Sequence, residues 1–376
     1  MQKKLIALAV AAAFSAPAFA DVTAYGVVDA AVVRVSADGQ KSDMQVVSGG
    51  LSTSRFGVKT VEDLNNGMKA VVVLEYEIDP QNNSSVGSTQ STAYVAALDM
   101  THTTSPFAAR QQMLALAGDF GTFATGYLQT TGYDWAVKFD PTAGSSVSPL
   151  QSMNTGSTFL VGSSAAAARA QRALAYISPD MGGVTVAVNY TTALAGLGNL
   201  TQPDTPAGDV KTTAMLLSAT YTGGPLSVGG VYAKTSAPTS AGETTDLALG
   251  GSYDLSVVKL FATYQTTKNG ASGAVSDKAM SFSAVAPVGP GAVLFSYAKS
   301  TLGKTTAGTL AENGSGYTVG YLQGLSKLTT AYATISKVSN GSDGTRYGVD
   351  NNAVAGGAMK AGGSSTMLAV GLNKKF

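Results

Sequence analysis

The chain of 376 residues contains no cysteine and a single histidine, which excludes several kinds of chemistry together. Without cysteine there can be no disulfide, no thiolate metal site and no cysteine nucleophile. The one histidine, His102, lies in a stretch rich in threonine and serine, and no nucleophile motif accompanies it. No cluster of carboxylates with histidine suggests a metal site. We therefore expect a protein that is not an enzyme and that needs no cofactor or metal.

Charge is also scarce, since only 12% of the residues are charged and 24 basic residues nearly balance 23 acidic ones. A nucleic-acid partner would require a clearly basic surface, so none is expected. Beyond residue 20 the chain has no apolar run of the ~20 residues that a membrane-spanning helix needs. The hydrophobic residues, 44% of the chain, must therefore be interspersed among polar ones.

The first twenty residues have the three parts of a secretory signal peptide. Lys3 and Lys4 form a basic start, an apolar stretch runs from Leu5 to Phe14, and the segment ends at Ala18-Phe19-Ala20. The apolar stretch is too short for a membrane anchor. We expect cleavage after Ala20, which makes residues 1–20 the signal peptide and residues 21–376 one mature domain.

Apolar residues alternate with small or polar ones in segment after segment. The segments 184–191, 246–253 and 280–285 each gather aliphatic or aromatic side chains on one face, while the other face is mostly Ser, Thr, Gly and Ala. A period of two is that of a β-strand with one apolar face. In a soluble sandwich the exposed face usually carries many charges, which are missing here. The pattern favours a barrel in lipid, whose apolar face points outward and whose polar face lines the lumen.

Short and long connections alternate along the chain. Short turn signals lie at 64–67, 119–122, 179–183, 222–225, 254–256, 287–291 and 323–326, and long polar stretches at 36–53, 79–109, 131–168, 192–210, 236–244, 267–277, 301–315 and 337–364. Seven turns and eight loops predict an all-β, antiparallel transmembrane barrel of sixteen strands. Fourteen or eighteen strands also fit, because the boundaries are defined only to within a few residues.

Distinctive short segments lie at Val22 to Ala30, Ser54 to Lys59 continuing from Glu62 to Ala70, Gly118 to Thr122, Tyr176 to Gly183, Tyr317 to Gly320 and Val370 to Phe376. In these segments the chain resembles the trimeric general porins of β-proteobacteria. The segments extend over the whole mature chain, and the stretch from Ser54 to Ala70 is the most specific. The resemblance implies a sixteen-stranded homotrimer in the outer membrane, in contact with its lipid and lipopolysaccharide.

The resemblance also implies that the third external loop folds into the barrel and narrows it. That loop would be Thr131 to Ala168, with Asp134 and Asp140 as its only acids, and Arg55 and Arg169 would be wall arginines facing it. Two positions depart from the family, which often has arginine where this chain has Tyr127 and Ala175. We therefore expect weak ion selectivity, leaning to anions.

The alternation of side chains along each strand, or strand parity, predicts which further charged residues face the lumen and which face lipid. If Phe56 and Val58 face lipid, Arg55 and Lys59 face the lumen, and the same argument turns Lys69, Glu75, Glu77 and Lys259 inward. A cation facing lipid at the bilayer midplane would cost roughly 2–4 kcal/mol. Lys59, Lys69 and Lys259 could equally be solvated wall residues with no role in selectivity. Arg110 and Arg172 have lipid-facing parity, so we expect them at the outer rim.

Taken together, these patterns predict a general diffusion porin, a water-filled channel for ions and small hydrophilic solutes. One alternative is a substrate-selective channel, which saturable block by one solute would reveal. Another is a plugged structural or adhesin barrel, which large ohmic conductance steps would exclude.

Overall fold

A computed structural model describes residues 20–81, 108–154, 161, 168–194, 213–236, 243–270, 276–302, 313–342, 344–350 and 359–376. Almost all of the expected signal peptide and His102 lie outside these residues.

The first half of the chain contains β1 (Ala20–Ala37), β2 (Asp43–Ser48), β3 (Arg55–Asp63), η1 (Asn65–Gly67), β4 (Lys69–Glu77), β5 (Ala108–Gly118), β6 (Gly121–Gln129), α2 (Thr131–Phe139), α3 (Pro149–Asn154), β7 (Arg169–Ile177) and β8 (Val184–Leu194). The second half contains β9 (Thr213–Gly223), β10 (Leu226–Ser236), β11 (Glu243–Asp254), β12 (Lys259–Asn269), β13 (Asp277–Val288), β14 (Gly291–Thr301), β15 (Asn313–Ser326), β16 (Thr329–Asn340) and β17 (Ser364–Lys375).

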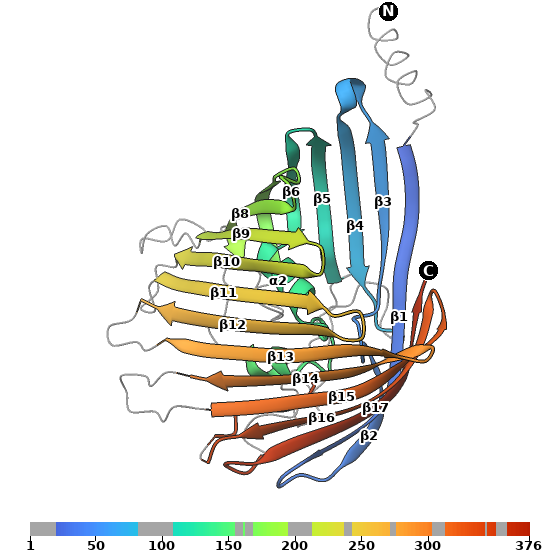
Figure 1. Cartoon of the computed structure of the whole chain (residues 1–376), viewed down its shortest axis with the longest axis vertical. Helices are drawn as coiled ribbons and strands as arrows, with labels where there is room; N and C mark the ends of the chain where they lie inside the picture. The colour runs from blue at the N-terminus through green and yellow to red at the C-terminus, as the bar shows by residue number, and fades with distance from the viewer. Residues whose placement is uncertain are drawn as a thin grey trace, which may run out of the picture.

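The strands form one closed antiparallel ring (Figure 1). One edge of β1 pairs with β17. Its other edge pairs with β3 along Ala20 to Val27 and with β2 along Ala30 to Val35. Because β2 and β3 follow each other along that edge, the seventeen strand segments occupy sixteen positions in the ring. The expected sixteen-stranded barrel is confirmed, and the pairing of β1 with β17 closes the sheet on itself.

Two predicted connections were wrong in detail. The expected loop at 36–53 contains β2, because the long strand β1 would otherwise leave backbone groups unpaired above β3. The expected turn at 323–326 is still strand, since a bulge between Gly324 and Ser326 lets β15 pair with β16 as far as Ser326. The turn itself lies at residues 327–328.

The two faces of the strands differ as the alternation predicts. On β13, Met280 and Phe282 are 46% and 45% exposed on the outward face, whereas Ser281 and Ser283 are 6% and 1% exposed on the inward face. Inward hydroxyls bond across the strands, with Ser283 Oγ donating to Ser296 Oγ at 2.9 Å. Hydrogen bonds of this kind satisfy polar groups on the inner wall, such as Ser283 and Ser296, while apolar side chains cover the outside.

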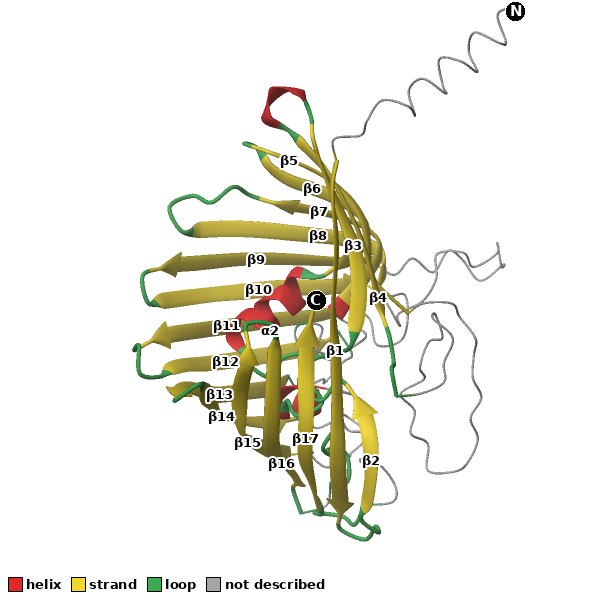
Figure 2. Cartoon of the chain, turned by 90° about the vertical axis from the view of Figure 1, so that its right-hand side faces the viewer, coloured by secondary structure: helices red, strands yellow, loops and turns green. Residues whose placement is uncertain are grey.

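Two helices of the third loop lie inside the ring (Figure 2). Helix α2 contacts β8 to β12 and buries Trp135 and Phe139, while α3 contacts β13 to β16 and buries Leu150 and Met153. In the part of the chain that the structure describes, no helix is long and apolar enough to cross a bilayer. The described helices of the third loop therefore lie against β8 to β16, and the inner faces of β3 to β7 lie elsewhere on the wall of the lumen.

Candidate functional site

Charged side chains gather on the inner wall that the third loop leaves free. Arg55 begins β3, Glu75 and Glu77 lie on β4, Arg110 is on β5 and Arg169 begins β7. We call these five residues the wall cluster. Adjacent strands of one sheet bring them together, although they span more than a hundred positions of sequence.

Glu75 is the centre of the cluster. Its carboxylate lies 2.9 Å from Arg110 Nε and 3.7 Å from Arg55 Nε, and it accepts a hydrogen bond of 3.1 Å from the Tyr25 hydroxyl. Arg110 also reaches Glu77, with 3.4 Å between Nη1 and Oε2. The Glu75 side chain is only 8% exposed, so its pairing with two arginines is weakly screened by solvent.

The expectation that Arg110 lies at the outer rim was wrong. Glu75 pairs with Gln111 and Tyr76 pairs with Ala109, so a β-bulge leaves Arg110 as an extra residue between them. A bulge shifts the alternation of side chains by one residue, which turns Arg110 inward onto Glu75. Arg172, whose parity was also lipid-facing, is exposed and has a positive φ of 48°.

Arg169 connects the wall cluster to the third loop. Its guanidinium donates to the carbonyl oxygens of Arg110 at 2.8 Å and Ala168 at 3.0 Å, and its Cζ atom lies 4.6 Å from the centre of the Tyr133 ring of α2. Asp134, the residue after Tyr133 on α2, is exposed and accepts a hydrogen bond from Gln129 Nε2. No carboxylate of the described residues lies within ion-pairing distance of Arg169.

The remaining predicted residues lie apart from the wall cluster. Lys59 is exposed on β3 opposite Val73, and Lys69 pairs with Asp63 at 3.2 Å beside the short turn between β3 and β4. Lys259 lies at the start of β12, with its ammonium nitrogen 5.3 Å from the centre of the Phe261 ring. These lysines therefore do not contact the arginines and glutamates of the cluster.

Asp140 is an internal anchor of the third loop. It is 2% exposed, and its carboxylate accepts hydrogen bonds from the Thr142 amide at 2.8 Å, the Thr142 hydroxyl at 2.6 Å and the Ser148 hydroxyl at 3.0 Å. Burial raises the pKa of Asp140 above its ordinary value, and these hydrogen bonds act in the opposite direction. The Asp140 carboxylate therefore points toward other residues of the third loop.

Sequence reasoning missed the role of two residues at this site, because it assigned Arg110 to the outer rim and did not consider Tyr25. Only the bulge reveals Arg110, whereas Tyr25 has inward parity on β1 and could have been found from alternation. The described residues contain no group of three or more His, Cys, Asp or Glu side chains that could hold a metal. The arrangement offers fixed charges beside a water-accessible lumen, which act on passing ions by electrostatic attraction and repulsion.

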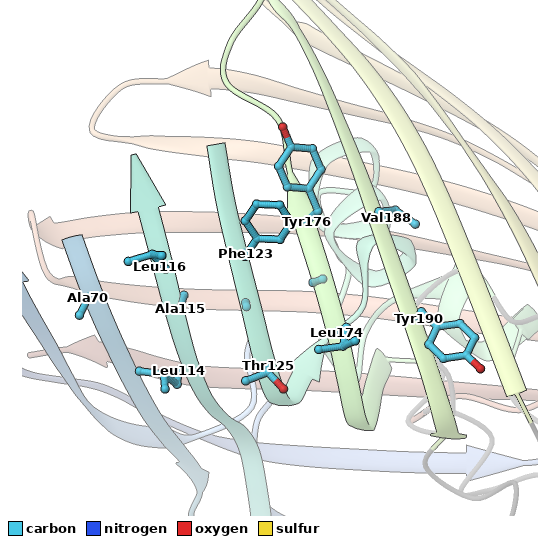
Figure 3. A pocket seen from close by; sticks show the side chains of 12 residues that line it. Ala70, Leu114, Ala115, Leu116, Phe123, Thr125, Leu174, Tyr176, Val188 and Tyr190 are labelled. Atoms are coloured by element: carbon cyan, nitrogen blue, oxygen red, sulfur yellow. The ribbon is translucent and has the colours of Figure 1, made fainter. Parts of the chain in front are cut away.

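An apolar depression of about 580 Å³ lies on the opposite, outward face of β4 to β8 (Figure 3). Its lining includes Leu114, Leu116, Phe123, Leu174 and Tyr190, all of them exposed on the outside of the ring. The depression therefore belongs to the surface that faces hydrocarbon and is separate from the lumen.

Comparison with known proteins gives consistent matches. A family model described as Gram-negative porin matches residues 7–343. Outer membrane porin protein 32 of Delftia acidovorans is 28% identical over 385 residues, covering 100% of both chains. Among solved structures, the anion-selective porin from Comamonas acidovorans has a TM-score of 0.70 and 25% identity, covering 95% of this chain and 100% of that one. OmpT of Vibrio cholerae in its trimer form shares the fold, with a TM-score of 0.61 and 15% identity over 95% of this chain and 99% of that one.

Proposed function

We propose, from the premise that this chain belongs to the Gram-negative porin family, that the wall cluster and α2 form the narrowest, charge-selecting part of its channel. As a porin, the protein is an outer-membrane diffusion channel that lets ions and small hydrophilic solutes pass passively. The family indicates a channel rather than an enzyme. We also propose that residues 1–20 are removed on export and that the outward face contacts outer-membrane lipid and lipopolysaccharide.

A weak preference for anions follows from the balance of charges at the wall cluster. Arg55, Arg110 and Arg169 face Glu75 and Glu77, which leaves one cation in excess. The nearby acid of the third loop, Asp134, offsets part of that excess, whereas Asp140 is buried inside the loop. The single observation that carries the proposal is Arg169, which lies against α2 with no carboxylate in ion-pairing distance among the described residues. The related Comamonas structure is described as anion-selective.

Single-channel recording in planar bilayers under a gradient of KCl tests this proposal. We expect ohmic conductance steps and a reversal potential that indicates a modest preference for chloride. Arg169→Gln and Arg55→Gln should each lower the ratio of chloride to potassium permeability, by roughly twofold for one partly screened charge. Lys69→Gln is the matched control, since Lys69 is paired with Asp63 beside a short turn and should leave the ratio unchanged. A strong cation preference of the wild type would refute the assignment.

We further propose that the protein is a homotrimer that associates through β16, β17, β1 and β2. The outward positions of these strands are mostly small or aliphatic, such as Ala333, Val370 and Val32. Arg34, Lys337 and Lys374 are the outward charges toward the strand ends, and no aromatic side chain points outward within the bounds of these strands. The flanking strands carry outward aromatics, Tyr317 and Tyr321 on β15 and the stacked pair Phe56 and Tyr76 on β3 and β4. Aromatic girdles mark lipid-facing surfaces, so a sector without them is suited to contact with another copy.

A bulky side chain distinguishes an outward position that contacts another copy from one that contacts lipid. Ala333→Trp on β16 should abolish the trimer seen by light scattering in mild detergent, because a large ring blocks close contact between copies. Ala262→Trp on β12, also outward and exposed, should leave the trimer intact, because lipid accommodates the ring. A monomeric wild type, or a trimer that withstands Ala333→Trp, would exclude this sector as the interface.

A further inference from the structure

Asp29 is a fully buried carboxylate on the inner face of β1, with an exposed fraction of 0%. Its Oδ1 atom accepts a hydrogen bond of 2.6 Å from the Tyr332 hydroxyl, and its Oδ2 atom accepts bonds from Asn373 Nδ2 at 2.7 Å and the Leu51 amide at 3.2 Å. In the part of the chain that the structure describes, no lysine or arginine lies within ion-pairing distance of it. Burying a carboxylate without a cation costs free energy, so these hydrogen bonds are needed to stabilise the Asp29 carboxylate in its buried position.

Asp29 also forms hydrogen bonds with the segment that connects β2 to β3. We call this connection, residues 49–54, the junction segment. At its two ends, the Gly49 amide donates to the Asp29 carbonyl at 3.0 Å, and Ser54 Oγ accepts from the Asp29 amide and donates to the Asp29 carbonyl, both at 3.0 Å. The Asp29 carboxylate bonds the middle of the segment at Leu51. Asp29 therefore fixes the junction segment at three points.

Two glycines allow the Tyr332 hydroxyl to reach Asp29. A Cβ atom on Gly371 would lie 2.3 Å from Tyr332 Cζ, and one on Gly50 would lie 2.0 Å from the Tyr332 hydroxyl oxygen. Any larger residue at either position would displace the ring. Tyr332 of β16 therefore passes over Gly371 of β17 and contacts the junction segment at Gly50.

The junction segment in turn positions Arg55 and touches the third loop. Arg55 Nη1 donates to Ser52 Oγ at 2.8 Å and to the Thr53 carbonyl at 2.9 Å, which directs Arg55 Nε toward Glu75. On the loop side, Ser146 Oγ donates to the Gly49 carbonyl at 3.3 Å. A displacement of the junction segment would therefore move an arginine of the wall cluster.

We propose that Asp29 is a positioning residue for Arg55, so that a carboxylate outside the wall cluster determines how strongly that arginine selects anions. The inference rests on the proposed function of the wall cluster. Asp29 acts by hydrogen bonding the junction segment, and with an exposed fraction of 0% it does not itself contact ions in the lumen.

The sign of the effect distinguishes positioning from direct electrostatics. If Asp29 acted only by its negative charge, Asp29→Asn would increase the preference for anions. If it positions Arg55, the same substitution weakens the bond to the Leu51 amide, lets Arg55 move from the lumen wall, and decreases the preference for anions. The two effects are opposite in direction.

A double-mutant cycle tests the proposal by measuring the permeability ratio of chloride to potassium in a KCl gradient. We expect Asp29→Asn to lower the ratio by up to about twofold, the limit given by Arg55→Gln, and to have no further effect in the Arg55→Gln background. Asn373→Ala is the matched control, since it removes one hydrogen bond to Asp29 from a residue of β17 outside the junction segment, and it should leave the ratio unchanged.

Each other result overturns the inference. A higher ratio with Asp29→Asn, the same decrease in the Arg55→Gln background, or an equal decrease with Asn373→Ala would each refute a positioning role while the proposed function stands. If Arg55→Gln itself leaves the ratio unchanged, the selectivity role of Arg55 fails and the inference fails with it. Should Asp29→Asn not yield a folded barrel, Ser54→Ala replaces it in the cycle, because it removes the bonds at the end of the junction segment without changing charge.

Discussion

Replacing Glu75 by glutamine is expected to make the channel clearly anion-selective. The carboxylate of Glu75 lies 2.9 Å from Arg110 and 3.7 Å from Arg55, so its removal leaves two guanidinium groups without their shared partner. One added net positive charge at a narrow point, worth about 1 kcal/mol after screening, should raise the permeability ratio of chloride to potassium about fivefold. The reversal potential in a KCl gradient measures this change.

The substitution should also destabilise the barrel, by about 1–3 kcal/mol, because glutamine keeps hydrogen bonds to the arginines but loses their charge assistance. Asp63→Asn is the matched control, since it removes an acid from an exposed pair with Lys69 and should change neither selectivity nor stability by much. An unchanged reversal potential for Glu75→Gln would place the narrowest point of the channel elsewhere.

Gly250→Val on β11 is expected to displace helix α2 from the inner wall. A Cβ atom at Gly250 would lie 2.7 Å from Cγ and Cδ2 of the Phe139 ring, far inside normal contact distance. Phe139 is 0% exposed, and loss of its packing should cost about 3–5 kcal/mol, as for other buried phenylalanines. Because α2 can move only toward the wall cluster, we expect lower mean conductance, larger current fluctuations and a lower denaturation temperature.

The neighbouring residue is the control for this experiment. Gly251 faces outward, and a Cβ atom there would meet its nearest neighbour, Val228 Cγ1, at an ordinary 3.6 Å. Gly251→Val should therefore preserve conductance and denaturation temperature. Equal behaviour of the two variants would show that contact between Phe139 and the wall does not hold the third loop in place.

Alternation along the strands was enough to predict the barrel. The period of two, the uncharged polar face and the alternation of short turns with long loops depend on local sequence alone, and the outward exposure of Met280 and Phe282 agrees with them. The family was identified from short segments such as Ser54 to Ala70, and a family model matching residues 7–343 confirms it. Arg55 and Arg169 could be named in advance because the resemblance to the family placed wall arginines at these positions, and the structure has them at the starts of β3 and β7.

Other features depended on contacts between distant residues. Strand parity alone turned Arg110 outward, and only the bulge against Glu75 and Tyr76 brought it into the wall cluster. Asp140 was expected to face the arginines, but its charge is directed into the loop by Thr142 and Ser148.

The sequence by itself therefore determined the class of fold, the family and which face of each strand meets lipid, because these follow from a repeat of two residues that every strand shares. The tertiary structure alone decided which charges meet. A bulge, a close approach over a glycine or a buried carboxylate such as Asp29 depends on partners up to 344 positions away, and no local pattern specifies such a partner.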